Sequence, residues 1–270
     1  MINRKRAGHV YDLGQYTVTE KAMEAYAEIA GGFTPVFGIV PVWSGIAAIN
    51  EDPDLGLDPS RVVHGEQRMR FLQPFRDGQV LRSKGTVESI AERGANEVVT
   101  LRVDSSELAA PVLSQWLVII SRGTAAAAKG GGSGGKPSSA EPPPATQEPP
   151  APTGERSTYL SPDITYRYAE AAGDDNRIHT DPEFARHAGL PGIIVQGMCL
   201  LHVATRAVLE VEGREPAEVG QLSARFASMF MPDQELRTRV WADGGGASFD
   251  ALGLDGKQVL KNGRLDLNHR

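Results

Sequence analysis

Apolar positions in the second half of the chain repeat first with a helical period and then with the period of a strand. A helix is predicted after Pro191-Gly192 from positions spaced by four and three residues, namely Ile194, Met198, Leu201, Thr205 and Val208. Alternating segments then predict strands over residues 220–230, 235–242, 247–254 and 258–267. This order predicts an antiparallel sheet wrapped around a central helix.

Two shorter helices are predicted before the long one. Ser161-Pro162-Asp163 is a helix start with Ser161 as the N-cap, and Gly173 is a stop signal. Asp181-Pro182-Glu183 opens a second helix that ends near Gly189. We therefore expect the segment from Gly173 to His179 to form a loop between two helices.

The chain contains an internal repeat. Tyr26-Ala-Glu-Ile-Ala-Gly31 and Tyr168-Ala-Glu-Ala-Ala-Gly173 share five of six residues at an offset of 168 − 26 = 142. A second match begins at Arg70 and at Arg225, with six identities over 13 residues at an offset of 225 − 70 = 155. The two matches indicate a duplication in which the second copy has 155 − 142 = 13 additional residues between them.

A segment of Ala, Gly, Ser and Pro separates the two copies. Residues 123–157 have almost no apolar side chains to bury against the entropy of ordering, so we predict a disordered or partly polyproline linker. The first domain is then expected over residues 1–122 and the second over residues 158–270. A linker of this length allows the two domains to pack against each other.

Composition excludes several classes of protein. No apolar run approaches the roughly 20 residues of a membrane span, and the basic residues 1–8 are not followed by the apolar segment of a secretory signal. We therefore expect a cytoplasmic protein without membrane association. The net charge of −6 argues against a nucleic-acid partner. The single cysteine, Cys199, excludes an internal disulfide and a cysteine-based metal site.

Proton-handling side chains are concentrated in Gly173-Asp-Asp-Asn-Arg-Ile-His179. Adding water across a conjugated double bond needs a base for the water and a proton donor for the neighbouring carbon. Asp174 and His179 can serve both needs near neutral pH, and Asn176 can orient them through its amide. The same residue types also shape turns that end helices, so the heptad alone leaves both interpretations open. The spacing and closing glutamate of a calcium loop are missing.

A glycine at the first turn of the predicted long helix strengthens the catalytic interpretation. The backbone N–H of Gly197, supported by the helix dipole, suits an oxyanion that forms on a thioester carbonyl. Glycine also permits close approach of a substrate. The alternative is that Gly197 is only a packing contact.

Together these motifs resemble the MaoC-like, (R)-specific enoyl-thioester hydratases and dehydratases of hot-dog fold. That family has an aromatic-rich helix, then Gly-Asp-x-Asn-Pro-x-His, then Pro-x-x-x-His-Gly at the start of the hot-dog helix. The residues that match are Tyr168, Gly173, Asp174, Asn176, His179 and Gly197. The first half resembles the family's N-terminal companion domain, including Val63-His64-Gly65-Glu66-Gln67. Arg177 and Gln196 depart from the pattern, since they replace a proline and a histidine.

The resemblance implies an α+β double hot-dog fold and a hydro-lyase that interconverts trans-2-enoyl and (3R)-3-hydroxyacyl thioesters. Asp174 and His179 would hold the water, Asn176 would orient them, and Gly197 would stabilise the enolate-like oxygen. The acyl group would be carried by coenzyme A or by an acyl carrier protein, in fatty-acid or polyketide metabolism. No metal or other cofactor is needed, and a homodimer is left open. The alternatives are a noncatalytic acyl-binding subunit and a hot-dog thioesterase.

The first repeat is expected to be catalytically silent. At the offset of 142, Asp174 corresponds to Gly32, Asn176 to Thr34 and His179 to Phe37, none of which exchanges protons at neutral pH. His64 lies at the start of a predicted strand without an acid nearby in sequence, which favours a structural role. Arg70 and its mate Arg225 suggest a shared fold contact, with phosphate binding as the alternative.

Overall fold

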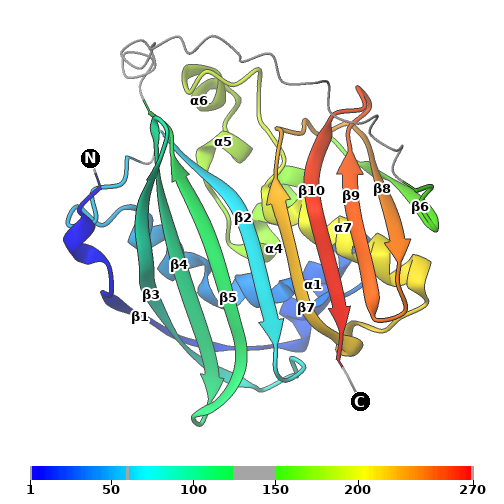
Figure 1. Cartoon of the computed structure of the whole chain (residues 1–270), viewed down its shortest axis with the longest axis horizontal. Helices are drawn as coiled ribbons and strands as arrows, with labels where there is room; N and C mark the ends of the chain where they lie inside the picture. The colour runs from blue at the N-terminus through cyan, green and yellow to red at the C-terminus, as the bar shows by residue number, and fades with distance from the viewer. Residues whose placement is uncertain (1, 59–60, 124–149, 269–270) are drawn as a thin grey trace, which may run out of the picture.

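The computed structural model describes residues 2–58, 61–123 and 150–268. Its strands form one ten-stranded antiparallel sheet in the order β1-β3-β4-β5-β2-β7-β10-β9-β8-β6 (Figure 1). The first repeat supplies β1 (Val10–Thr17), β2 (Val62–Phe71), β3 (Val80–Arg93), β4 (Asn96–Glu107) and β5 (Ala110–Ser121). The second repeat supplies β6 (Gly154–Leu160), β7 (Val219–Phe226), β8 (Gln234–Ala242), β9 (Gly246–Leu252) and β10 (Gln258–Leu267). The two halves therefore have the same strand order when each is read outward from the central pair β2–β7.

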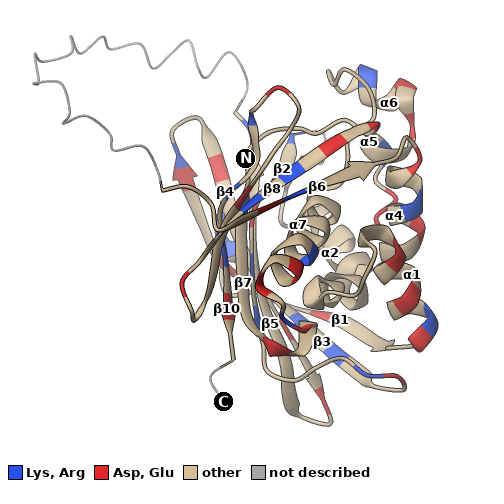
Figure 2. Ribbon diagram, turned by 90° about the vertical axis from the view of Figure 1, so that its right-hand side faces the viewer, with Lys and Arg blue, Asp and Glu red and all other residues tan. Residues whose placement is uncertain are grey.

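The main helices cover one face of this sheet, as the side view shows (Figure 2). The α-helices are α1 (Glu20–Ala30), α2 (Trp43–Asn50), α4 (Ile164–Ala172), α5 (Arg177–Thr180), α6 (Pro182–His187) and α7 (Gly197–Glu212). The described residues also form three 3₁₀ helices, η1 (Arg4–Arg6), η2 (Pro35–Val42) and η3 (Pro216–Glu218). A sheet that curves around a helix in each repeat is the double hot-dog architecture expected from the sequence.

The two repeats are related by an internal twofold axis. In the β2–β7 pair, Arg68 lies opposite Ser223, and 223 − 68 = 155 is the offset of the second sequence match. Among the helices, the rings of Tyr26 and Tyr168 lie 5.8 Å apart, and 168 − 26 = 142 is the offset of the first match. Equivalent residues that meet each other must lie close to the axis. The duplication inferred from the sequence is therefore also the symmetry of the fold.

The long helix α7 is the centre of the second repeat. It was predicted to be amphipathic, but 11 of its 16 residues are buried. The reason is that α7 contacts strands of the sheet and also α1 and η2 of the first repeat. The helix begins at Gly197 rather than near Ile194, since Gln196 is its N-cap with a non-helical ψ of 136°, and the Val195 N–H before it donates to the Phe230 carbonyl at 2.8 Å.

The same contact explains where the first strand of the second meander ends. The alternating pattern predicts a strand to residue 230, but β7 ends at Phe226. The following residues leave the sheet, and Phe230 pairs with the segment before α7 instead. The helix predicted from Ser161 begins at Ile164 with Asp163 at the N-cap. Its end is as predicted, since Gly173 adopts a left-handed conformation, as its repeat mate Gly31 does at the end of α1.

Most of the predicted linker, residues 124–149, lies outside the described residues. Strand β6 begins at Gly154, so the second repeat starts four residues before the expected boundary at 158. The last residues of the predicted linker are therefore part of the sheet, where they pair with β8. Among the described residues, no helix combines the length and apolar character needed to cross a membrane.

Candidate active site

The heptad from Gly173 to His179 is divided between a short loop and a helix. Gly173 ends α4, and the chain then passes through Asp174 to Asn176, which is the N-cap of α5. The Asn176 side chain accepts a hydrogen bond from the Ile178 N–H at 3.3 Å. His179 therefore lies on α5 and not in the loop where the sequence placed it. The side chain of Asn176 is exposed and caps this helix, and in the described part of the chain its side-chain amide makes no hydrogen bond to Asp174 or His179.

Asp174 is buried, with 4% of its surface exposed. Burial raises the pKa of its carboxyl group to about 7, and the neighbouring charge of Asp175 acts in the same direction. A hydrogen bond from the backbone N–H of Asn176 opposes the shift. The Oδ1 atom of Asp174 has no hydrogen-bond partner among the described residues. A buried carboxyl group with an unpartnered oxygen and a pKa near neutral pH is suited to act as a general acid or base.

His179 is held as one neutral tautomer. Its Nδ1 lies 2.7 Å from the Ile194 carbonyl, which can only accept, so Nδ1 carries the proton and donates it. Burial lowers the pKa of the ring to about 4. The Nε2 atom is therefore left with a free lone pair at neutral pH. This nitrogen can accept a proton from a water molecule.

Asp174 and His179 line the same cavity, which has a volume of about 380 Å³. It lies where α5 and the start of α7 approach one end of the β2–β7 pair (Figure 1). Most of its wall is apolar and comes from both repeats, including Trp43, Ile46, Val62, Leu117, Ile119, Ile120, Ile178, Ile194, Met198, Phe226 and Met229. The two proton-handling groups thus face an apolar space that is large enough for part of an acyl chain.

Gly197 is the first residue of α7 and also lines this cavity. N–H groups in the first turn of a helix lack a partner within the helix, and the helix dipole favours negative charge beside them. The absence of a side chain matters here, because a Cβ atom at this position would lie 3.0 Å from Cδ1 of Phe226. The structure therefore places an N–H donor and the acid–base pair around one volume.

The two departures from the family pattern have clear structural roles. Gln196 is fully buried, and its Nε2 donates to the Thr165 carbonyl of α4 at 2.9 Å, with the Asp174 carbonyl at 3.5 Å. Arg177 is exposed, pairs with the Asp181 carboxylate at 2.6 Å and lies over the Phe184 ring. Gln196 thus links the start of α7 to the catalytic loop, and Arg177 ties α5 to α6.

In the first repeat, the positions equivalent to Asp174, Asn176 and His179 take part in packing contacts. A Cβ atom on Gly32 would lie 2.7 Å from the Arg206 guanidinium, so no carboxylate could be placed there without a shift. Thr34 is buried and bonds to Nδ1 of His202 at 2.8 Å. Phe37 is buried with its ring against Tyr26. The contacts of Gly32 and Thr34 join the two repeats, whereas the contact of Phe37 with Tyr26 lies within the first repeat.

Two residues of the cavity wall were not recognised as site residues from the sequence. His64, on β2, lies beside Phe226 with 4.7 Å between ring centroids. Arg122 is the one arginine among the described residues that lines the cavity. The alternative basic pair lies elsewhere, since Arg225 is 3.8 Å from Glu66 and Arg70 lines a separate cavity. Within the described ranges, no group of three or more His, Cys, Asp or Glu side chains is arranged to hold a metal ion.

Both halves of the chain match known protein families. The MaoC like domain matches residues 143–260, and the MFE-2 hydratase 2 N-terminal domain matches residues 18–123. The 3-hydroxyacyl-thioester dehydratase Y of Mycobacterium tuberculosis is 30% identical over 224 residues, which cover 77% of this chain and 73% of that protein. The peroxisomal enoyl-CoA hydratase 2 of Arabidopsis thaliana is 29% identical over 199 residues, which cover 71% of this chain and 63% of that protein.

A solved structure has the same fold as the described residues. The MaoC-like dehydratase from Phytophthora capsici superposes with a TM-score of 0.82 at 21% identity, covering 99% of this chain and 98% of that one. The chain spans 63%, 36% and 31% of the length of three curated relatives that it matches. The two domain matches and the M. tuberculosis relative show that the chain belongs to the MaoC-like hydratase and dehydratase family.

Proposed function

We propose that this chain adds water to trans-2-enoyl thioesters and removes it from (3R)-3-hydroxyacyl thioesters. The observation that carries the proposal is the inverted order of two pKa values in one cavity. The pKa of Asp174 is raised to about 7, and that of His179 is lowered to about 4. A proton shared by the pair therefore resides on the carboxyl group, and the imidazole stays neutral.

One shared proton is what the reaction needs in both directions. In hydration, Nε2 of His179 accepts a proton from water while the water oxygen bonds to C3, and Asp174 delivers its proton to C2. Dehydration is the reverse: with the shared proton on His179, Nε2 gives it to the leaving hydroxyl group while the ionised Asp174 removes a proton from C2. The pair ends each turnover with one proton, so no outside acid or base is consumed.

The remaining walls support the same chemistry. The Gly197 N–H is suited to the thioester oxygen, on which negative charge accumulates when the C2–C3 bond is attacked. The apolar wall accepts the acyl chain and excludes bulk water, which strengthens the hydrogen bond to the oxyanion. Asn176 and Gln196 act through position, since one caps α5 and the other holds the loop against α4.

The carrier of the acyl group is coenzyme A or an acyl carrier protein, and both present a phosphorylated pantetheine arm. Arg122 is exposed and lines the cavity, so it is suited to a phosphate of that arm. The relatives named for hydration of enoyl-CoA and for dehydration of 3-hydroxyacyl thioesters support the reaction type. A place in fatty-acid or polyketide metabolism, a cytoplasmic location, a homodimer and the silence of the first repeat stay predictions.

Crotonyl-CoA tests the proposal directly. We expect its enoyl absorbance to fall without release of free thiol, and the product to be (3R)-3-hydroxybutyryl-CoA on chiral analysis. Release of thiol at the rate of enoyl loss would show a thioesterase. Binding of crotonyl-CoA without turnover of it or of (3R)-3-hydroxybutyryl-CoA would show an acyl-binding subunit.

A further inference from the structure

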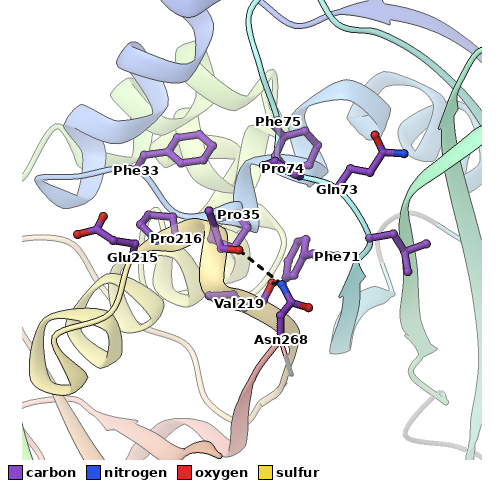
Figure 3. Close-up of a pocket in the computed structure, with 12 residues that line it drawn as sticks. Phe33, Pro35, Phe71, Gln73, Pro74, Phe75, Glu215, Pro216, Val219 and Asn268 are labelled. Atoms are coloured by element: carbon purple, nitrogen blue, oxygen red, sulfur yellow. Dashed lines mark hydrogen bonds between the residues drawn. The ribbon is translucent and has the colours of Figure 1, made fainter. Parts of the chain in front are cut away.

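The protein has a second cavity that is the symmetry mate of the active site. It has a volume of about 270 Å³ and lies at the opposite end of the β2–β7 pair, with Phe71, Phe75 and Val219 in its wall (Figure 3). At the offset of 155, Phe71 corresponds to Phe226, which lines the catalytic cavity. Each cavity thus combines the loop of one repeat with a strand of the other.

The two cavities differ at the positions that carry chemistry. The second cavity has no equivalent of Asp174 or His179, because Gly32 and Phe37 occupy their positions. The residue equivalent to His64 is Val219, since 219 − 155 = 64. The cavity that contains Asp174 and His179 therefore also has the imidazole of His64, whereas the second cavity has the aliphatic side chain of Val219 at the equivalent position.

We propose that His64 is a substrate-binding residue of the active site, which accepts a hydrogen bond from the first amide N–H of the pantetheine arm. This role rests on the proposed function, because it takes the bound molecule to be an acyl thioester. The first repeat then contributes a recognition group as well as apolar wall.

The backbone of β2 directs His64 into the cavity. The pairing with β5 is regular from Phe71 to Glu66 and then shifts, so that Glu66 lies opposite Val118 and His64 opposite Ile119. Gly65 is the additional residue of this bulge, and a Cβ atom there would lie 2.5 Å from Cδ1 of Ile120. A bulge changes the face to which the next side chain points, and bulges occur often beside active sites.

Hydrogen bonding defines which nitrogen of His64 can accept. Nε2 lies 3.1 Å from the Glu66 carbonyl, so Nε2 carries the proton and donates it. Burial lowers the pKa of the ring to about 4, against smaller effects of Glu66 and the Gln67 side chain, so the ring is neutral. Nδ1 is then an acceptor, and it calls for a donor from the substrate.

The distances suit the pantetheine amide. Phe226 separates His64 from Gly197, with 4.7 Å between the two rings and Phe226 in contact distance of Gly197. If the thioester oxygen binds the Gly197 N–H, the sulfur lies beside Phe226. The first amide nitrogen follows the sulfur by two methylene groups, about 4 Å in an extended chain. This length bridges the ring of Phe226 and brings the amide to His64.

The test compares two small thioesters that differ in the amide. Crotonyl-N-acetylcysteamine has it, and S-ethyl crotonothioate does not. We expect His64→Phe, which keeps an aromatic contact to Phe226, to lower kcat/KM for the first substrate by about three- to tenfold relative to the second, the range of one neutral hydrogen bond. His64→Asn, which restores an acceptor oxygen, should recover part of this ratio. Val219→Ala in the second cavity is the control and should leave the ratio unchanged.

Equal losses with both substrates, or no loss, would overturn the role of His64 and reduce it to packing. The saturated analogues butyryl-N-acetylcysteamine and S-ethyl thiobutyrate separate this outcome from failure of the proposed function. Their dissociation constants depend on binding alone. If His64→Phe weakens only the amide-containing ligand, the recognition role holds even for a chain that does not hydrate crotonyl thioesters.

Discussion

Replacing Asp174 by asparagine should remove activity and at the same time make stability less dependent on pH. The substitution keeps the shape of the side chain but cannot exchange a proton. We expect kcat/KM for hydration of crotonyl-CoA to fall by at least about 100-fold, as is usual when a general acid or base is removed. Asp175→Asn is the matched control, since Asp175 is the adjacent carboxylate and is exposed.

The effect on stability follows from the raised pKa of Asp174. Its pKa is about 7 in the folded protein, against an ordinary value of 3.8, so between these pH values the folded state binds more protons than the unfolded state. Stability is therefore lost as pH rises through this window. At pH 8 the loss approaches 7 − 3.8 = 3.2 units, or about 4 kcal/mol. Asparagine avoids this pH-dependent loss, but its amide is buried at a site where Oδ1 has no partner. This lowers the unfolding free energy by about 1–3 kcal/mol.

The change between two pH values isolates the ionisation, because the cost of the buried amide does not depend on pH. From pH 5 to pH 8 the parent should lose about 2.5 kcal/mol more unfolding free energy than Asp174→Asn. The contribution of His179, whose pKa is lowered to about 4, is common to both proteins and cancels. Urea unfolding at the two pH values measures the difference. Parallel curves for parent and variant would refute the burial argument, and near-parental activity would refute the catalytic role.

Three further predictions test other parts of the site. The pH profile of kcat/KM should be bell-shaped, rising above about pH 4 as His179 loses its proton and falling above about pH 7 as Asp174 loses its proton. Activity that keeps rising above pH 7 would mean that Asp174 acts in its ionised form. Gly197→Ala should lower kcat/KM about tenfold through the clash with Phe226, and Phe226→Leu in the same chain should restore part of it if the clash is the cause. Gln196→Leu should lower the unfolding free energy by about 1–3 kcal/mol in urea, since the Thr165 carbonyl loses its donor, and an unchanged midpoint would contradict this.

The parts of the fold that the sequence predicted are those that depend on local pattern and repetition. Gly173 ends a helix by its own conformation, and Asp181 caps α6 with its own side chain, so both could be recognised from a few residues. The two offsets of the repeat contain the symmetry of the sheet. The last residue of β7 and the first residue of α7 could not be predicted, because the hydrogen bond from Val195 to Phe230 joins positions 35 residues apart.

The site shows the same division. The heptad and Gly197 were recognised because their residue types occur close together in sequence. His64 was assigned a structural role because Asp174 and His179, with which it lines one cavity, lie more than 100 residues away in sequence. The sequence did contain one signal for a functional role. Gly65 follows His64 in a predicted strand, and a glycine in a strand often marks a bulge that can redirect a neighbouring side chain. Only the register of β2 against β5 shows that it does so here.

The internal symmetry explains why the chain has two equivalent cavities at the ends of the β2–β7 pair but one candidate active site. Each cavity needs a loop from one repeat and the β2 or β7 strand from the other, so a substitution that improves one cavity does not have to be repeated in its mate. Positions in the first repeat that lack the proton-handling side chains can form contacts between the repeats, as the hydrogen bond between Thr34 and His202 shows. Placing Asp, Asn and His at 32, 34 and 37 would require Arg206 to move, remove the hydroxyl group that bonds to His202 and replace the ring that packs on Tyr26. The same packing that holds the repeats together keeps the chemistry at the end of the sheet where His64 stands.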